Sequence, residues 1–157
     1  MFVPEEKASY VRKTFDAIVP HYDLMNRIMT GGRDEAWRRL TARQARVPES
    51  GRLLDVAAGT ADLSLAIARQ HPTASVYALD FSLPMLMRGK EKVDGRADKA
   101  RIRFAAGDAL QLPFPAGTFH AVTSAFLVRN VTDIEKAFAE MARVAVPGGQ
   151  VLCLEIS

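Results

Sequence analysis

The sequence predicts an α/β fold in which a parallel sheet carries helices on its faces and a helical cap precedes it. From residue 51 onward, short apolar runs alternate with segments of helical spacing. Such alternation is typical of βαβ units with right-handed crossovers. The preceding residues have helical spacing instead. We therefore expect a helical cap over residues 1–50 and an α/β core over residues 51–157.

The core is expected to hold five strands and three helices. The strands are RLLDVAA (52–58), SVYALDF (75–81), RIRFAAGD (101–108), FHAVTSAFL (119–127) and QVLCLEI (150–156). The helices are ADLSLAIARQH (61–71), LPMLMRGKEKVDG (83–95) and DIEKAFAEMARVA (133–145). Ser82 is a predicted N-cap, and Thr132 with Glu135 forms a predicted capping box. The segment VPGGQ (146–150) is a predicted turn that leads into the last strand.

In the first 50 residues, apolar side chains recur at intervals of three and four, which predicts one helical face. They are Phe15, Ile18, Tyr22, Met25 and Met29. A second helix is expected over WRRLTARQAR (37–46), which carries four arginines. Two interpretations of these arginines stay open, a solvated face and a contact with an anionic membrane surface.

The sequence stops at Ser157, directly after the last expected strand. A buried parallel strand is normally paired on both sides, and an unpaired apolar edge invites aggregation. We therefore expect the sheet to lack its last strands in this chain.

Composition excludes several classes of protein. The formal net charge of +3 is too small to indicate nucleic-acid binding. The single cysteine, Cys153, excludes a disulfide framework and a cysteine metal site, and its apolar surroundings predict an inert buried thiol. No pair of histidines has metal-ligand spacing, so we expect no metal. No apolar run reaches the roughly 18 residues of a membrane span, and no signal peptide opens the chain. These features predict a cytoplasmic protein.

The segment LLDVAAGTADLS (53–64) is typical of a strand, a tight turn and a helix start, the arrangement of a nucleotide-binding loop. It does not match the dinucleotide fingerprint G-x-G-x-x-G, because only Gly59 is a glycine. Asp62 stands at the helix start, where a diphosphate would lie, and Asp55 adds a second negative charge. These two carboxylates disfavour a diphosphate and favour a cationic nucleoside cofactor, S-adenosylmethionine.

Two further carboxylates follow expected strands. Asp80 ends the second strand, about twenty residues beyond the loop, where it can accept hydrogen bonds from ribose hydroxyls. Asp108 ends the third strand and suits the adenine amino group. Open α/β sheets bind ligands at the carboxyl ends of their strands, so these carboxylates should converge on one crevice. A helix-capping role for Asp80 and a turn role for Asp108 are the alternatives.

The core resembles class I S-adenosylmethionine-dependent methyltransferases, and more narrowly the ubiquinone/menaquinone biosynthesis C-methyltransferases of the demethylmenaquinone methyltransferase type. The segment FDAIVPHYDLMNRIMTGGRDEAWRR (15–39) is similar to the family's N-terminal signature. LDVAAGTADLS and GDALQLPF are similar to its cofactor motifs, and RNVTD (129–133) with VPGGQVLCLEIS is similar to its later signature. The resemblance covers essentially the whole chain and implies a Rossmann-like sheet.

The resemblance implies cofactor contacts at Thr60, Asp80, Asp108 and Ala109. The chain departs from the family pattern at Ala58 and Ala61, which replace glycines, and an alanine at position 61 fits only if its φ is negative. Ala125 stands where the family often has a cofactor-binding serine, and Leu127 would narrow the pocket.

The implied reaction is C-methylation of a demethylated quinol in respiratory quinone biosynthesis, with benzoquinol and naphthoquinol substrates both open. Arg129 is the expected stabiliser of a phenolate-like oxygen, and Asn130 would orient it. Pairing of Arg129 with Asp133 is the structural alternative. Tyr22 and the adjacent Asp23 would cover the quinol, and His21 is a candidate base.

The apolar residues of the cap are either helix core or the entrance for an isoprenoid tail. A lipid substrate would bring the chain to the inner face of the membrane as a peripheral protein.

Three other functions stay open: methylation of another small phenolic or lipid metabolite, a non-catalytic fragment that binds the cofactor, and an NAD-dependent oxidoreductase. The charge at Asp62 disfavours the last.

Overall fold

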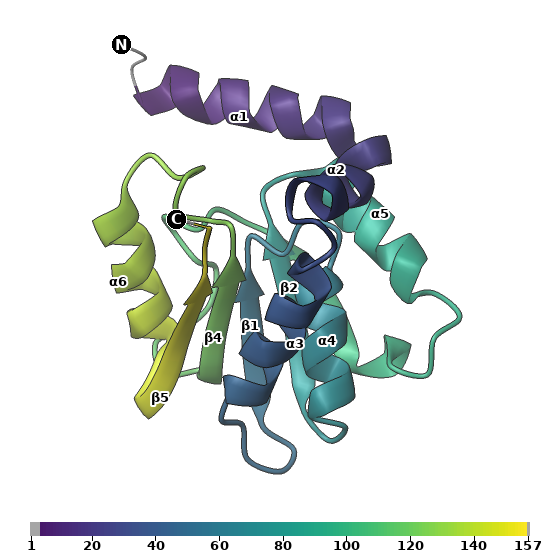
Figure 1. The fold of residues 1–157 in the computed structure, drawn as a ribbon. Coiled ribbons are helices and arrows are strands. Elements are labelled where there is room, and N and C mark those ends of the chain that lie inside the picture. Colours follow the sequence, from purple (N-terminus) through teal and green to yellow (C-terminus); the bar gives the residue numbers. More distant parts are fainter. Residues whose placement is uncertain (1–3, 157) are drawn as a thin grey trace.

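The computed structural model describes residues 4–156 and contains the predicted parallel sheet (Figure 1). Its strands are β1 (Arg52–Val56), β2 (Ser75–Asp80), β3 (Ile102–Ala106), β4 (Phe119–Ala125) and β5 (Ala145–Leu154). Their order across the sheet is β3-β2-β1-β4-β5, and all four pairings are parallel. The predicted fold class is therefore confirmed.

Successive residues of the central strands belong to two different core clusters, one on each face of the sheet. Leu53 packs in one cluster together with α4 (Asp62–Gln70), whereas Leu54 packs in the other together with α6 (Ile134–Val144). Side chains of a strand alternate between its faces, so a strand that is apolar on both faces must be covered on both. This is why the central strands read as continuous apolar runs in the sequence.

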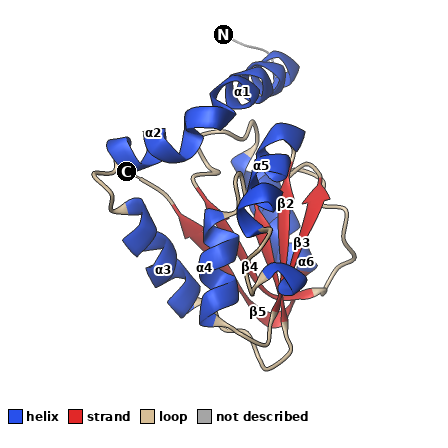
Figure 2. Cartoon of the chain, turned by 90° about the vertical axis from the view of Figure 1, so that its right-hand side faces the viewer, coloured by secondary structure: helices blue, strands red, loops and turns tan. Residues whose placement is uncertain are grey.

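The helices cover the two faces unequally. Val93 of α5 (Leu83–Val93) joins the α4 cluster, and so do Ala42 and Ala45, at the end of and just after α3 (Asp34–Gln44). Helix α6 supplies Met141 and Val144 to the opposite cluster. Helix α3 thus packs with the core, beside α4 (Figures 1 and 2).

Helices α1 (Pro4–Ile18) and α2 (Tyr22–Met29), joined by the short 3-10 helix η1 (Val19–His21), lie beyond the carboxyl ends of the strands (Figure 1). We call residues 4–29 the cap helices. The single helical face expected from Phe15 to Met29 is wrong in this respect, because η1, with Pro20 in its first turn, breaks the helix. Proline fixes φ and cannot donate a hydrogen bond, so it favours a new helical start.

Other local predictions have mixed outcomes. Ser82 caps α5, accepting from the Met85 amide at 3.4 Å, as predicted. Helix α6 is capped by Asp133, which accepts from the Lys136 amide at 2.9 Å, so the predicted capping box at Thr132 is wrong. The predicted VPGGQ turn lies inside β5, where residues 146–149 bulge out between two paired positions.

Strand β5 pairs with β4 alone within residues 4–156, and Ser157 lies outside the described residues. Cys153 is exposed on this edge strand, so the predicted burial of its thiol is wrong. Partial burial of the Cys153 thiol nevertheless raises its pKa, and a raised pKa disfavours the thiolate.

Candidate functional site

A cavity of about 410 Å³ lies at the carboxyl ends of the strands, beneath the cap helices. We call it the main cavity. Its walls include seven of the predicted site residues: Tyr22, Gly59, Asp80, Asp108, Ala109, Ala125 and Asn130. The rule that open α/β sheets bind ligands at this edge therefore led to two residues of its wall, Asp80 and Asp108.

Two smaller spaces adjoin the main cavity. A space of about 20 Å³, the small cavity, is lined by Asp55, Thr60, Asp62 and Arg38 among others. A groove of about 250 Å³, the cap groove, lies along the cap helices and includes Arg129 and Asn130 in its wall. Tyr22 lines all three spaces. His21 is exposed and is absent, within residues 4–156, from the residues that line them.

The β1–α4 loop (residues 57–61) turns by means of left-handed residues. Ala57, Gly59 and Ala61 have φ values of 56°, 56° and 67°. The prediction that an alanine fits at position 61 only with a negative φ is therefore wrong. Gly59 alone lacks the Cβ that makes this conformation costly. A Cβ at position 59 would lie 3.6 Å from the Tyr22 ring, so the loop passes close beneath the cap helices.

Asp80 holds this loop in place. Its Oδ2 accepts from the Gly59 amide at 2.8 Å, and its Oδ1 accepts from the Ser82 amide at 2.8 Å. The side chain is buried, and burial raises the pKa of Asp80 although the backbone amides act in the opposite direction. Asp80 therefore joins the loop after β1 to the start of α5, and its carboxylate also faces the main cavity.

Asp108 is exposed at the far side of the main cavity. Its Oδ1 accepts from the Leu110 amide at 2.8 Å, a turn within its own loop. A carboxylate has two oxygens, so this contact leaves Asp108 able to accept from a ligand.

Asp55 lies deep beneath the loop. Burial raises its pKa to about 7, although hydrogen bonds from Ser64 and Thr123 oppose the shift. The sequence argument treated Asp55 as a full negative charge beside the cofactor. That part of the argument is wrong, because a carboxyl with this pKa is protonated in a large fraction of molecules near neutral pH.

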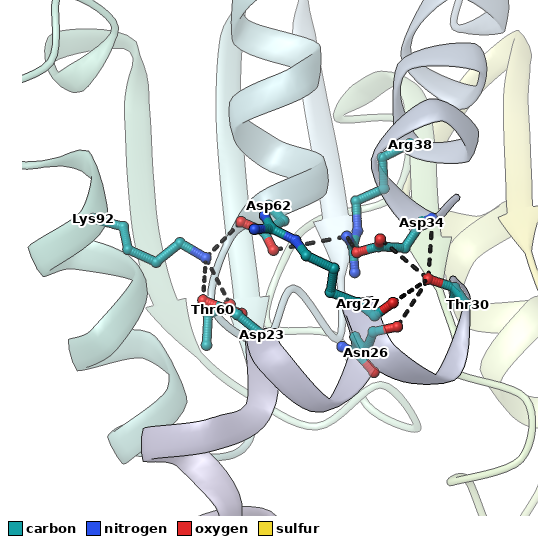
Figure 3. Close-up of polar contacts among 9 residues, drawn as sticks. All are labelled: Asp23, Asn26, Arg27, Thr30, Asp34, Arg38, Thr60, Asp62 and Lys92. Atoms are coloured by element: carbon teal, nitrogen blue, oxygen red, sulfur yellow. Dashed lines mark hydrogen bonds and ion pairs between the residues drawn. The ribbon is translucent and has the colours of Figure 1, made fainter. Parts of the chain in front are cut away.

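Asp62 is already paired with two basic side chains (Figure 3). Lys92 of α5 forms an ion pair with its Oδ1, and Arg38 of α3 lies 3.7 Å from its Oδ2. Arg38 is buried and also pairs with Asp34. Both interpretations of the arginines, a solvated face and a contact with the membrane surface, are therefore wrong for this residue. Both cations are shared, Lys92 with Asp23 and Arg38 with Asp34, so they reduce the negative charge at the helix start without cancelling it.

Thr60 lies in the same cluster. Its hydroxyl donates to Asp23 Oδ1 at 2.6 Å and accepts from Lys92 Nζ at 3.0 Å. The sequence reasoning missed Lys92 as a member of the site. It occurs in the charged run KEK, where nothing distinguishes it from a solvated lysine.

The cap groove brings together the apolar residues of the cap helices. Its wall includes Phe15, Ile18, Tyr22, Met25 and Met29, the five predicted to share one helical face. They share the groove although η1 separates them.

Arg129 is exposed at the edge of this groove, 5.5 Å from the centre of the Phe126 ring. Asn130 donates to the Phe126 carbonyl at 2.8 Å. The alternative pairing of Arg129 with Asp133 is not among the ion pairs of the described residues, and Asp133 caps α6 instead.

The sequence model of the ubiE/COQ5 methyltransferase family matches residues 3–157. The chain belongs to this family. It is 46% identical to a demethylmenaquinone methyltransferase of Roseiflexus castenholzii, over 98% of the chain and 63% of the relative. It is 42% identical to a ubiquinone/menaquinone biosynthesis C-methyltransferase of Geobacter sulfurreducens, over 100% of the chain and 62% of the relative.

A solved structure agrees with this fold. A putative S-adenosyl-L-methionine-dependent methyltransferase from Methanococcus maripaludis has a TM-score of 0.71 at 23% identity, over 92% of this chain and 62% of that one. The chain spans somewhat less than two thirds of the length of the Roseiflexus castenholzii and Geobacter sulfurreducens relatives. Methyl transfer is the family's reaction.

The left-handed alanines lead to a prediction about stability. The left-handed region costs a residue with a Cβ roughly 1–2 kcal/mol, while the freedom of glycine in the unfolded chain costs roughly 0.4–1 kcal/mol. We expect Ala57→Gly to raise the free energy of unfolding by about 0.5–1 kcal/mol in urea titrations. Ala58→Gly is the matched control, because Ala58 does not have a positive φ. Ala58→Gly should lower the free energy of unfolding. Equal effects of the two substitutions would contradict the inference that the left-handed conformation of Ala57 is strained.

The raised pKa of Asp55 predicts a pH dependence. The unfolded carboxyl ionises near pH 4, so between about pH 4 and pH 7 the folded chain keeps a proton that the unfolded chain has lost. The contribution of Asp55 to stability therefore falls as the pH rises through this window. We expect urea midpoints of the wild-type chain to fall from pH 5 to pH 8, and those of Asp55→Asn to fall less.

Asp94→Asn is the control for this experiment, because Lys99 lowers the pKa of the exposed Asp94 and moves its titration below the window. It should keep the wild-type pH dependence. Parallel curves for Asp55→Asn and the wild type would mean that Asp55 is ionised in the fold.

Proposed function

We propose that this chain binds S-adenosylmethionine in the main cavity and methylates a ring carbon of a demethylated quinol held in the cap groove. The observation that supports this most is the meeting of the two spaces. Val11, Phe15, Tyr22 and Asn130 line both of them. The two spaces are therefore adjacent at these residues, and a cofactor in the main cavity would lie next to a molecule in the groove.

The residues of the main cavity fit the cofactor. Asp80 and Asp108 both line the cavity, where Asp80 would accept from ribose hydroxyls and Asp108 from the adenine amino group. Gly59 lets the loop backbone approach the ligand closely. When bound, S-adenosylmethionine supplies a methyl group activated by a sulfonium.

The groove fits a substrate with one polar ring and an apolar tail. Arg129 carries a permanent positive charge at the edge of the groove and would stabilise a phenolate oxygen. Asn130, fixed by its bond to the Phe126 carbonyl, would orient the ring or Arg129. Tyr22 would separate the quinol from solvent, and Met25 and Met29 would contact an isoprenoid tail. Flexible thioether side chains adapt well to such a chain.

Contact with the membrane surface would bring the chain to such a substrate. Within residues 4–156 no helix is long and apolar enough to cross a membrane. Helix α2 nevertheless exposes Leu24, Ile28 and Met29, with 58%, 70% and 65% of each residue accessible. Exposed apolar side chains on an amphipathic helix are suited to peripheral binding.

The deciding experiment incubates the chain with S-adenosylmethionine and a demethylated benzoquinol or naphthoquinol that carries a short isoprenoid tail. We expect a product heavier by one methylene unit in mass spectrometry. Thermal shifts with S-adenosylhomocysteine and with NADH run beside it. A shift with S-adenosylhomocysteine but no product would favour the non-catalytic alternative, and a shift with NADH alone would contradict the proposed cofactor.

The role of Arg129 is tested by Arg129→Ala. Loss of a charged stabiliser of a developing oxyanion costs about 10²- to 10³-fold in kcat. We expect a loss of that size with an unchanged dissociation constant for S-adenosylhomocysteine, measured by calorimetry. Arg39→Ala is the control, because Arg39 is exposed on α3 and pairs only weakly with Glu35, at 3.7 Å. A variant Arg129→Ala that has lost cofactor binding would instead assign Arg129 to the structure of the main cavity.

A further inference from the structure

The ammonium group of Lys92 joins three parts of the chain. It donates to Asp23 Oδ2 at 2.8 Å, to Thr60 Oγ1 at 3.0 Å and to Asp62 Oδ1 (Figure 3). These partners belong to α2, to the β1–α4 loop and to the start of α4. A lysine ammonium has three protons, so each of them has a partner here. No part of this cation is left for a ligand.

Lys92 and Asp23 are partly buried, so their ion pair is less screened by water than a surface pair. The Lys92 side chain is 16% exposed and that of Asp23 is 35% exposed. Exposed ion pairs contribute little because water screens them, whereas a partly buried charge that loses its partner is strongly disfavoured. Burial alone would raise the pKa of Asp23, but the hydrogen bonds from Lys92 and Thr60 outweigh it and leave this pKa below its ordinary value.

Helix α5 lies directly against the loop beside Lys92. A Cβ at Gly89, one turn before Lys92, would lie 3.1 Å from the Thr60 carbonyl carbon and 3.2 Å from the Ala61 Cβ. These distances are shorter than most contacts of a real Cβ, so the glycine allows α5 to pack closely against the loop. The position of Lys92 relative to Thr60 is therefore fixed by backbone packing as well as by charge.

On the cap side, the partner of Lys92 is Asp23, which directly follows Tyr22. Asp23 also accepts from Thr60, so one bond ties α2 to the loop and another ties it to α5. Tyr22 covers Gly59 and lines the main cavity. Fixing Asp23 thus fixes the ring that closes the main cavity.

The charges explain why Lys92 in particular is needed. Asp23 and Asp62 both approach the Thr60 region, and like charges at this distance repel each other. Arg38 is already shared between Asp34 and Asp62. Without Lys92, Asp23 would face Asp62 with no cation of its own, and repulsion would favour a cap that has moved away from the loop.

We propose that Lys92 is a positioning residue that couples closure of the cap helices to cofactor binding. It acts by holding Asp23 and Asp62 together across the β1–α4 loop. This inference rests on the proposal that the main cavity binds S-adenosylmethionine. If only the closed cap binds the cofactor, the apparent dissociation constant rises as the closed fraction falls.

The test compares Lys92→Met with Lys90→Met. Both remove one positive charge from α5, but Lys90 is exposed and outside the cluster. The probe is S-adenosylhomocysteine, measured by calorimetry at a temperature where thermal melts show every variant to be folded. We expect Lys92→Met to weaken binding about tenfold, Lys92→Arg to restore part of it, and Lys90→Met to bind as the wild type does.

Hydrogen exchange supplies a second readout, which separates local opening of the cap helices from a loss of stability of the whole fold. Amides of α1 and α2 should exchange faster in Lys92→Met, while those of β1 and β4 should keep their protection. Asp23→Asn should have the same effects, and in the double variant with Lys92→Met the losses should be less than additive. Asp23→Asn also provides the test if Lys92→Met does not fold.

Wild-type affinity in both Lys92→Met and Asp23→Asn would overturn the inference, as would equal effects of Lys92→Met and Lys90→Met. A wild-type chain that does not bind S-adenosylhomocysteine would contradict the proposed cofactor itself, a result distinct from unaltered affinity in the variants.

Discussion

The hydrogen bond from the Gly59 amide to the Asp80 carboxylate is the interaction on which the site depends. It fixes the β1–α4 loop against the end of β2. The other oxygen of Asp80 accepts from Ser82, whose side chain begins α5 and also donates to Asp16 of α1 at 2.6 Å. One buried carboxylate thus positions the loop, the helix that carries Lys92 and part of the cap. Such a group is stable when buried only because backbone amides satisfy it.

Three aspartates near the loop avoid the cost of a buried charge in three different ways. Asp55 has a pKa of about 7 and is largely protonated below neutral pH, Asp62 is paired with two cations, and Asp80 accepts from backbone amides. The sequence shows three carboxylates and hence three negative charges. The folded site therefore carries less negative charge than three free carboxylates would, and hydrogen-bond geometry and shape contribute to discrimination between ligands.

The parts of the fold that depend on local pattern could be predicted from the sequence. The strands were found because apolar runs ended at turn residues, and Asp80 and Asp108 were found because strand ends converge. Lys92 could not be found, since its partners Asp23, Thr60 and Asp62 are thirty or more residues away and its own neighbours resemble a solvated surface. The burial of Arg38 could not be found either, because it depends on the approach of α4, which supplies Asp62. The positive φ of Ala61 could not be predicted, because the tertiary fold imposes this left-handed conformation against the local preference of alanine.

The position of Tyr22 as a common wall of three cavities constrains how this molecule can diversify. A change at Tyr22 alters every compartment together, so new ligand preferences are hard to acquire there. Met25 and Met29 border the cap groove alone, and Asp108 borders the main cavity alone. Among related proteins, substitutions that change ligand preference should therefore occur mainly at residues that border a single cavity. Position 22 should stay aromatic.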